Sequence, residues 1–501
     1  MKSDSNPGNS QAAAPAQPPA KAAGAPSPAS PATSQTPFSA LPLAPTLLEN
    51  LQALGLHHMT PIQAAALPLA LAGHDLIAQA KTGSGKTAAF ALSLLSRLNP
   101  RWFAVQALVM CPTRELADQV AQEIRRLARA ENNIKILTLC GGSTMRPQIA
   151  SLAHGAHIVV GTPGRLMDHL ERGTLDLSNL NTLVLDEADR MLDMGFFDDI
   201  VAVARQCPKE CQTLLFSATY PEGIGKLSQQ FLKNPKEVKV QTVHEASTIR
   251  ELWYEVADTE RLHTVSRLLA HHRPANTIAF CNTRQQCRDL VDVLSAEGIE
   301  AQALHGELEQ RERDQVLLQF ANKSLSVLVA TDVAARGLDI AQLEAVINVD
   351  VTPDAEVHIH RIGRTGRAGQ DGLALNLASM DEMGRVGRIE VLQGREVSWQ
   401  PLDSLTPASR EPLSPPMVTI QILGGRKEKI RPGDVLGALT GKAGLEGSRI
   451  GKINVTDFHT YVAVERGIAQ EALRQLASVK VKGKKVKARM LADVIRDGKD
   501  A

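Results

Sequence analysis

Two widely separated segments constrain this chain more than any other part of its sequence. The first runs from Ala80 to Thr87, reads Ala-Lys-Thr-Gly-Ser-Gly-Lys-Thr and follows an apolar run. The second is Asp186-Glu187-Ala188-Asp189, which follows the apolar run 182–185. A glycine-rich loop that opens a helix offers backbone N–H groups to phosphates, and carboxylates suit the metal that accompanies them. Together the two segments predict a nucleoside triphosphate site.

The loop residues have distinct expected roles. Gly83 and Gly85 let the backbone approach phosphates, Lys86 is expected to reach the β- and γ-phosphates, and Thr87 is expected to bind Mg²⁺ through its hydroxyl. The strict pattern has a glycine where Ala80 stands, so the match is one residue short. The expected nucleotide contacts in this loop are Ala80, Thr82, Gly83, Ser84, Gly85, Lys86 and Thr87.

The acidic pair provides the second half of the expected site. Asp186 is expected to hold Mg²⁺ through water, and Glu187 is expected to orient or deprotonate the attacking water. Acidic clusters are usually solvated surface, but this pair follows an apolar strand in the same unit as the loop. Lys86, Asp186 and Glu187 are therefore candidate catalytic residues.

Short apolar runs alternate with helical patterns over the first 400 residues. This alternation predicts an α/β fold with two doubly wound parallel sheets, in which ligands bind at the carboxyl ends of strands. A module with the pattern β-α-β-β-α-β follows, as in ferredoxin-like, RRM-type RNA-binding domains. The expected division is a disordered Ala/Pro-rich tail (1–36), two α/β domains (37–240 and 251–401), a linker (402–416) and the C-terminal domain (417–491).

Positive charge gathers in the C-terminal module, although the whole chain carries only +1. From Glu411 onward, 17 Lys and Arg stand against 10 Asp and Glu, which suggests an anionic partner. The expected strands Val418–Leu423 and Thr460–Val464 offer only Tyr461 for base stacking, so a phosphate grip is expected instead. A solvated basic surface is the alternative. The basic residues singled out are Lys427, Lys429, Arg431, Lys484 and Lys485.

Other features exclude whole classes of function. None of the six cysteines forms a Cys-x-x-Cys pair, so no zinc cluster is expected. No apolar stretch reaches the roughly 18 residues needed to span a bilayer, and the N-terminus lacks the apolar core of a signal peptide. We expect a soluble, cytoplasmic monomer with no membrane partner.

Further motifs follow one another in a fixed order, and with them the chain resembles the DEAD-box ATP-dependent RNA helicases over about residues 38–367. The resemblance implies two RecA-like domains and an RNA-stimulated ATPase, an enzyme acting on acid anhydrides. The motifs are Thr60–Gln63; Pro112–Ala117; Gly141-Gly142; Thr162–Arg165; Ser217–Thr219; His305-Gly306 with Gln310 and Arg313; Thr331-Asp332 through Arg336–Asp339; and His360–Arg367.

The resemblance also implies which residues select ATP. Gln63 would read the adenine edge, Phe38 would stack on the adenine ring, and Asp339 would contact the ribose. Leu56 and Met59 stand where the family often has Phe and Pro, but the glutamine is present.

The resemblance implies roles for two further pairs of residues. Arg364 and Arg367 would act as arginine fingers delivered on domain closure, an effect worth about 10³–10⁵ in rate. Ser217 and Thr219 would couple the ATP site to that closure.

The same resemblance implies RNA contacts on both domains. Such contacts go to phosphates and sugars, so they position the strand without reading its sequence, and the 2′-hydroxyl distinguishes RNA from DNA. The implied residues are Arg114, Gly142, Thr162 and Arg165 on the first domain, and Thr283, Gln310, Arg313, Thr331 and Gly337 on the second.

A mechanism and a target follow from these expectations. Because each domain holds half of both sites, ATP and RNA should tighten each other's binding, and unwinding should be local and non-processive. The stretches 429–440 and 450–453 resemble the C-terminal domain of the DbpA subfamily. This implies recognition of a 23S ribosomal RNA hairpin and a role in assembly of the large (50S) ribosomal subunit.

Two rival functions stay open at this point. The first is an ATP-gated RNA clamp without productive unwinding, and the intact Lys86, Glu187, Arg364 and Arg367 argue against it. The second is a DNA helicase, which the Asp-Glu-Ala-Asp and Ser-Ala-Thr segments oppose.

Overall fold

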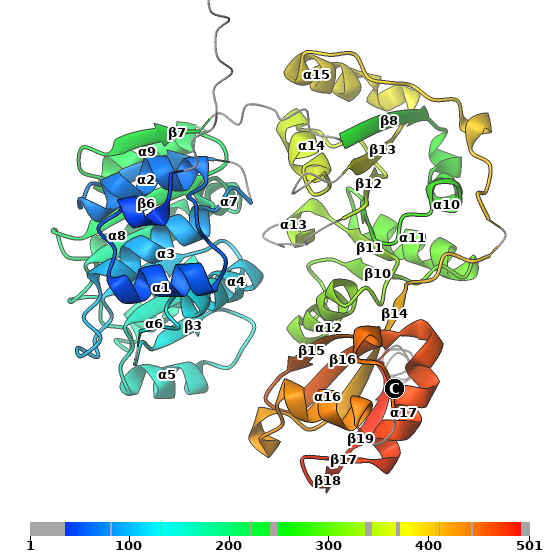
Figure 1. Cartoon of the computed structure of the whole chain (residues 1–501). Helices are drawn as coiled ribbons and strands as arrows, with labels where there is room; N and C mark the ends of the chain where they lie inside the picture. Colours follow the sequence, from blue (N-terminus) through cyan, green and yellow to red (C-terminus); the bar gives the residue numbers. More distant parts are fainter. Residues whose placement is uncertain are drawn as a thin grey trace, which may run out of the picture.

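The computed structural model describes residues 36–80, 83–131, 133–220, 222–240, 249–335, 343–366, 371–409, 411–441 and 444–491. Three units built from strands and helices follow one another along the chain (Figure 1). In that view the first unit lies on the left, the second at the upper right and the third below the second. Four expected site residues and most of the expected tail lie outside the described ranges: Thr82, Gly337, Asp339, Arg367 and residues 1–35.

The first unit is a seven-stranded sheet with the order β3-β4-β2-β5-β6-β1-β7, and every neighbouring pair is parallel. Its strands are β1 (Leu76–Gln79), β2 (Ala107–Met110), β3 (Ile136–Leu139), β4 (Ile158–Gly161), β5 (Thr182–Leu185), β6 (Gln212–Ser217) and β7 (Lys236–Lys239). Its helices are α1 (Pro45–Ala53), α2 (Pro61–Leu71), α3 (Lys86–Arg97), α4 (Arg114–Leu127), α5 (Met145–Ala153), α6 (Pro163–Glu171), α7 (Ala188–Asp193), α8 (Phe197–Arg205) and α9 (Glu222–Phe231).

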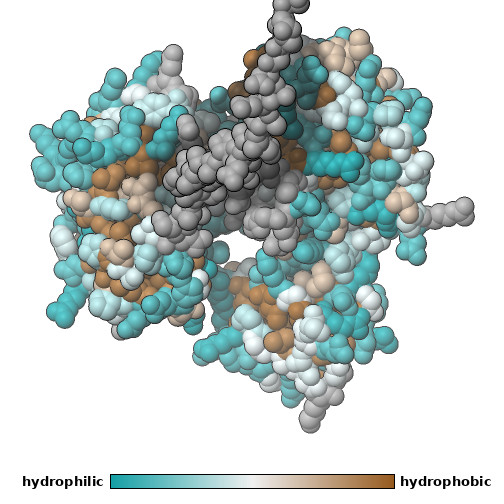
Figure 2. Space-filling view, turned by 45° about the horizontal axis from the view of Figure 1, so that its top comes forward, coloured by the Kyte–Doolittle hydropathy of each residue, from teal (hydrophilic) through white to brown (hydrophobic). Residues whose placement is uncertain are grey.

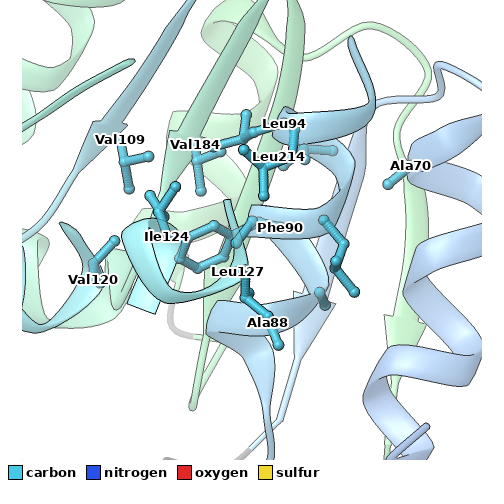
Figure 3. Packing of buried hydrophobic residues seen from close by; sticks show 14 of the residues in the cluster. Ala70, Ala88, Phe90, Leu94, Val109, Val120, Ile124, Leu127, Val184 and Leu214 are labelled. Carbon is cyan, nitrogen blue, oxygen red and sulfur yellow. The ribbon is translucent and has the colours of Figure 1, made fainter. Parts of the chain in front are cut away.

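Helices cover both faces of this sheet, which explains why its central strands are continuous apolar runs. Side chains of alternate residues point to opposite faces, so Val109 and Val184 enter one core while Leu108 and Leu183 enter the other. Figure 3 shows Phe90 of α3 packed among side chains of α4 and the strands. Burial of one such ring contributes about 1.5–3 kcal/mol, and the two cores hold the strand ends in fixed positions.

The second unit repeats the architecture with a six-stranded parallel sheet of order β10-β11-β9-β12-β13-β8. Its strands are β8 (Ile249–Glu255), β9 (Thr277–Phe280), β10 (Ala301–Leu304), β11 (Val327–Ala330), β12 (Ala345–Asn348) and β13 (Gly372–Ala378). Its helices are α10 (Arg261–His272), α11 (Arg284–Ala296), α12 (Gln310–Ala321), α13 (Asp332–Ala335), α14 (Ala355–Ile362) and α15 (Met383–Gln393).

The third unit is an antiparallel sheet of order β15-β16-β14-β19 with two helices. The expected β-α-β-β-α-β pattern is confirmed by β14 (Met417–Leu423), α16 (Pro432–Thr440), β15 (Ile450–Val455), β16 (His459–Glu465), α17 (Ala469–Ser478) and β19 (Lys487–Met490). Two parallel-sheet domains followed by a ferredoxin-like domain were the predicted fold class, and the structure confirms it.

A short hairpin precedes the last strand of this unit. Lys484 and Lys485 belong to it, as β18 (Lys484–Lys485) paired with β17 (Lys480–Val481), and not to β19. Its turn uses left-handed backbone at Lys482 (φ 49°) and Gly483 (φ 80°), which reverses the chain before β19 begins.

Hydrophilic residues cover most of the surface visible in Figure 2, and hydrophobic residues gather in a few patches. Within the described ranges, the structure contains no helix that is both long enough and apolar enough to cross a membrane.

Candidate active site

The motif segments of the first unit meet at one edge of its sheet. Strand β6 lies between β1 and β5 in parallel register, so the three carboxyl ends are neighbours. The glycine-rich loop follows β1, the acidic pair follows β5, and Ser217 ends β6. The backbone N–H of Ala80 donates to the carbonyl of Ser217 at 3.0 Å, which ties two of these segments directly.

The loop has the backbone that a phosphate cradle needs. Gly83 and Gly85 have φ of 81° and 92°, a left-handed conformation that favours glycine. Lys86 is only 6% exposed, and its Nζ donates to the carbonyl of Ala80 at 2.7 Å. The Ser84 hydroxyl is buried without a hydrogen-bond partner. Buried donors at a helix N-terminus fit a polyphosphate, which would satisfy them.

Gln63 lies against this loop. Its Nε2 donates to the carbonyl of Gly85 at 3.0 Å, and its Oε1 accepts from the N–H of Thr60 at 2.9 Å. A Cβ at Gly85 would lie 2.5 Å from that Nε2, so the contact requires glycine. Phe38 is 3% exposed within the core. The adenine contacts expected of Gln63 and Phe38 stay predictions.

The acidic pair is buried beside the loop. The pKa of Asp186 is raised to about 7, chiefly by burial; the charge of Lys86 opposes the shift, and the charge of Glu187 adds to it. Asp186 accepts from the N–H of Glu187 at 3.1 Å. Glu187 has φ 52° and ψ 52° at the start of α7, a left-handed conformation that costs about 1–3 kcal/mol. In this strained conformation Glu187 stands between β5 and α7, so its carboxylate lies near the end of β5.

The donors available for a metal suit Mg²⁺ bound together with phosphates. Among the described residues there is no cluster of three or more His, Cys, Asp or Glu side chains that could hold an ion alone. Mg²⁺ typically takes one or two protein oxygens and completes its shell with water and phosphate. The Thr87 hydroxyl and the Asp186 carboxylate are donors of this type.

Asp189 links the acidic segment to the turn after β6. Its Oδ2 accepts from the backbone N–H and the hydroxyl of Thr219, at 2.9 and 2.8 Å. The hydroxyl of Ser217 donates to the carbonyl of Thr219 at 2.6 Å. The two residues expected to couple the site to closure are thus bonded to α7 through Asp189, which the sequence analysis did not single out.

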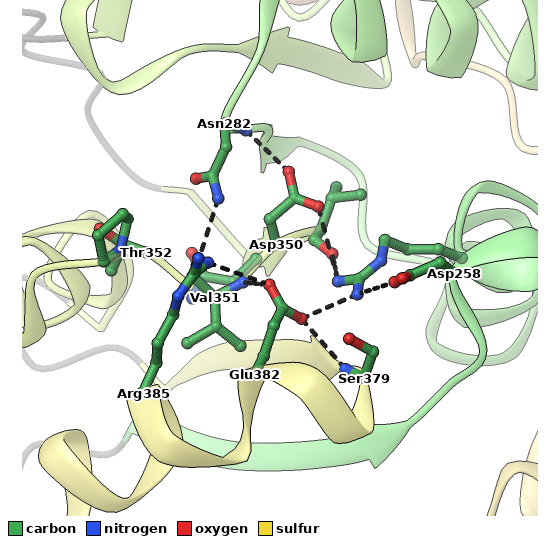
Figure 4. A network of polar contacts seen from close by, with 12 residues as sticks. Asp258, Asn282, Asp350, Val351, Thr352, Ser379, Glu382 and Arg385 are labelled. Carbon is green, nitrogen blue, oxygen red and sulfur yellow. Dashed lines mark hydrogen bonds and ion pairs between the residues drawn. The ribbon is translucent and has the colours of Figure 1, made fainter.

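In the second unit, Arg361 of α14 is a buried structural anchor. Its Nε and one terminal nitrogen each donate to the Asp332 carboxylate at 2.7 Å, and it also donates to the carbonyl of Asp350. Figure 4 shows the adjoining network, in which Asp350 accepts from the N–H of Asn282 and Glu382 accepts from the N–H groups of Val351 and Ser379. The contacts of Arg361 hold the end of α14, and in the turn that follows the N–H of Arg364 donates to the carbonyl of Arg361 at 3.1 Å.

The two units meet at His360 and Arg364. A small cavity there is lined by Arg190, Phe280, Asp332, Ala335, Val357, His360, Arg361 and Arg364. Burial, with the charges of Arg190 and Arg364, lowers the pKa of His360 to about 4, and Asp189 opposes the shift. Arg364 therefore faces the α7 segment that begins after the acidic pair. Whether it contacts a nucleotide stays a prediction, as does the role of Arg367.

A second contact between the units involves Gln310 and Arg313, two expected RNA residues of the second unit. Arg313 Nε donates to Glu115 Oε1 at 2.6 Å, and Gln310 Nε2 donates to the same oxygen at 3.4 Å. Burial opposes ionisation of Glu115, but the charge and hydrogen bond of Arg313 outweigh it and lower its pKa. A terminal guanidinium nitrogen of Arg114 lies 3.9 Å from a carboxylate oxygen of Asp314. The sequence analysis missed Glu115, although it stands within the Pro112–Ala117 motif.

The remaining expected RNA residues are spread over both units. Arg165 on α6 donates to the carbonyl of Ser143 at 3.1 Å and so steadies the loop that contains Gly142. Thr162 precedes α6, Thr283 caps α11, and Thr331 precedes α13. The basic residues of the third unit are exposed, in the β14–α16 connection and the β17–β18 hairpin: Lys427, Lys429, Arg431, Lys484 and Lys485.

Three family models match the chain in sequence order. They are the DEAD/DEAH box helicase (residues 60–227), the helicase conserved C-terminal domain (260–369) and the DbpA RNA binding domain (419–490). The ATP-dependent RNA helicase DbpA of Escherichia coli is 52% identical over 91% of this chain and 100% of its own length. The DEAD-box ATP-dependent RNA helicase CshA of Bacillus cereus is 43% identical over 71% of this chain and 68% of its own.

A solved structure supports the same relation. Dbp5 of S. cerevisiae, bound to RNA and ADP BeF3, is 32% identical and superposes with a TM-score of 0.68. The match covers 74% of this chain and 96% of that one.

The raised pKa of Asp186 predicts a pH effect on stability. The folded pKa of about 7 lies above the unfolded value of about 4, so the folded state binds more protons between these values. Stability of the metal- and nucleotide-free protein should therefore fall as pH rises through this window. Asp186→Asn removes the pH-dependent contribution of this carboxyl to stability. The melting temperature of the variant minus that of the parent should therefore increase as pH rises from 5 to 8. The exposed Asp198→Asn is the control, and parallel curves for Asp186→Asn and the parent would contradict the assignment.

The Glu115–Arg313 contact predicts how the two units are held together. Glu115→Gln removes the negative charge opposite Arg313, and the loss of a nearly buried ion pair should separate the units more often. Small-angle scattering should then report a larger radius of gyration. Asp118→Asn is a matched control because Asp118 pairs with Arg114 on its own helix. Equal radii for the parent and Glu115→Gln would show that the contact does not hold the units.

Proposed function

Because this chain belongs to the DEAD-box ATP-dependent RNA helicases of the DbpA type, we propose that it couples RNA-stimulated ATP hydrolysis to local, non-processive separation of RNA duplexes. We further propose that its C-terminal domain directs this activity to a 23S ribosomal RNA hairpin during assembly of the 50S subunit. The observation that supports the coupling is the contact of Arg313, an expected RNA residue of the second domain, with Glu115 of the first domain, which directly follows the expected RNA residue Arg114. The protein would act as a monomer in the cytoplasm.

The loop residues bind the triphosphate in this proposal. Lys86 exchanges the carbonyl of Ala80 for β- and γ-phosphate oxygens, and the unpartnered Ser84 hydroxyl gains an acceptor. Thr87 and Asp186 hold Mg²⁺, which supplies positive charge to the phosphates when bound. Glu187 orients the attacking water, and Gln63, Phe38 and Asp339 select the adenosine.

Closure completes the site in this proposal. Arg364 and Arg367 stabilise the negative charge that develops on the transferred phosphoryl group. The Asp189–Thr219 bonds connect the acidic segment to the turn after β6, and α7 also carries Arg190, which lies near His360 of the second domain. Nucleotide and RNA each favour the closed arrangement, so each tightens the binding of the other.

Local separation follows from the energy available in one cycle. Base-pair steps in DNA stack with about 1.4 kcal/mol each, so one closure disrupts only a few pairs. Unwinding by this mechanism falls steeply with duplex length.

The alternative, a clamp that ATP locks without hydrolysis-driven turnover, predicts different kinetics. In our proposal RNA stimulates phosphate release, and Glu187→Gln lowers the rate by about 10²-fold or more because the water loses its orienting base. The variant should still bind ATP and RNA, which equilibrium binding checks. Wild-type protein that releases phosphate at the same rate with and without RNA would favour the clamp.

The targeting role is tested with a panel of ribosomal RNA fragments. Removal of residues 417–501 should abolish the preference of the ATPase for the fragment that contains the target hairpin, while stimulation by unrelated RNA persists. An unchanged preference would place target recognition in the helicase domains. DNA of equal length serves as the control for the DNA helicase alternative.

A further inference from the structure

The open face of the C-terminal sheet, where RNA-recognition domains stack bases, is covered in this protein. Thr419 of β14 lies against the connection from α12 to β11, where its hydroxyl bonds to the hydroxyl of Ser324 at 2.7 Å and accepts from Asn322 Nδ2 at 3.2 Å. Tyr461 of β16 is 7% exposed and bonds to Gln421 of the neighbouring strand. The described sheet therefore presents no ring of Phe, Tyr or Trp to an incoming base.

An exposed ring stands just beyond this sheet. Phe458, in the turn between β15 and β16, is 57% exposed. The Nζ of Lys427 lies 4.0 Å from its ring centroid, a cation–π contact from the neighbouring β14–α16 connection. A large ring left in water with a cation over one face has its other face available for stacking.

Backbone contacts hold the two connections together. Gly424 N–H donates to the carbonyl of Phe458 at 3.0 Å, and Lys427 N–H donates to the carbonyl of Asp457 at 3.1 Å. A Cβ at Gly425 would lie 2.3 Å from the carbonyl oxygen of Thr456, so the close approach requires glycine there. The backbones that carry the ring and the ammonium are thus held in a fixed frame, and little backbone entropy remains to be lost on binding.

Cations outnumber acids around this frame, although Arg426 lies 3.7 Å from Asp457 and Lys482 lies 3.8 Å from Asp434 as ion pairs. Lys482 Nζ donates to the carbonyl of Lys429 at 2.6 Å, and Leu423, the last residue of β14, pairs with Lys487 of β19. On the first domain, burial lowers the pKa of Arg125; the charge of Asp118 opposes the shift, and the charge of Arg426 adds to it. Arg125 of the first unit and Arg426 of the third therefore repel each other, and an anionic chain would relieve that repulsion.

We infer that Phe458 is a stacking platform for an unpaired RNA base, with Lys427 placed to hold the adjoining phosphate. The inference rests on the proposed RNA-binding role of the C-terminal domain and names the contact that role would use. Base stacking on aromatic side chains tolerates any base, whereas the basic surroundings favour a nucleic acid over an apolar peptide.

The test uses the full chain and a labelled RNA hairpin with an unpaired loop, together with the same stem closed as a blunt duplex. Phe458→Ala should weaken hairpin binding about 5- to 150-fold, the range that base–aromatic stacking spans, and leave duplex binding unchanged. Its salt dependence should stay parallel to that of the parent because no phosphate contact is lost. Lys427→Gln should instead reduce the salt slope by about one.

Phe458→Trp should retain hairpin affinity, which separates stacking from damage to the fold. Leu436→Ala, an exposed apolar position on α16, is the matched control and should bind as the parent does. If Phe458→Ala binds the hairpin as tightly as the parent does, the inference is wrong. Phe458 would then be assigned to a contact with another protein. If removal of residues 417–501 also leaves hairpin affinity unchanged, the proposed targeting role fails with it; if removal alone weakens binding, only the stacking site is wrong.

Discussion

The parallel pairing of β5, β6 and β1 is the constraint on which the site depends. Register between these strands places three carboxyl ends side by side, and each end carries a different chemical group. Because the strands are buried on both faces, the position of every following loop is set by the core. Lys86, Asp186 and Ser217 are brought together by this packing, although the sequence separates them widely.

The degree of burial decides which charged pairs around this frame are strong and which are weak. Asp186 and Lys86 are both buried, and the charge of Lys86 opposes the effect of burial on the pKa of Asp186. Between the domains, Glu115 and Arg313 form a nearly buried pair, whereas Arg114 and Asp314 lie in an exposed one. Exposed pairs are worth about 0–1 kcal/mol, so Arg114 can exchange its partner for a phosphate at small cost. The buried pair is better suited to hold the domains in one arrangement.

The third domain shows how a familiar fold can present a different surface. Its strand order is that of an RNA-recognition domain, but Thr419 and Tyr461 on the usual binding face are covered. Contacts from Ser324 and Asn322 make that face part of the joint to the second domain. The exposed pair Phe458 and Lys427 lies instead in the connections between its elements.

The sequence by itself determined the elements and the local chemistry, because hydrophobic periodicity and glycine-rich turns act over short distances. Strand β5 covers the apolar run 182–185, and the phosphate loop begins at Ala80, directly after β1. Only the tertiary structure decided which distant groups meet, such as Glu115 with Arg313 and Asp189 with Thr219. Packing of whole domains sets those distances, and no spacing along the chain records it.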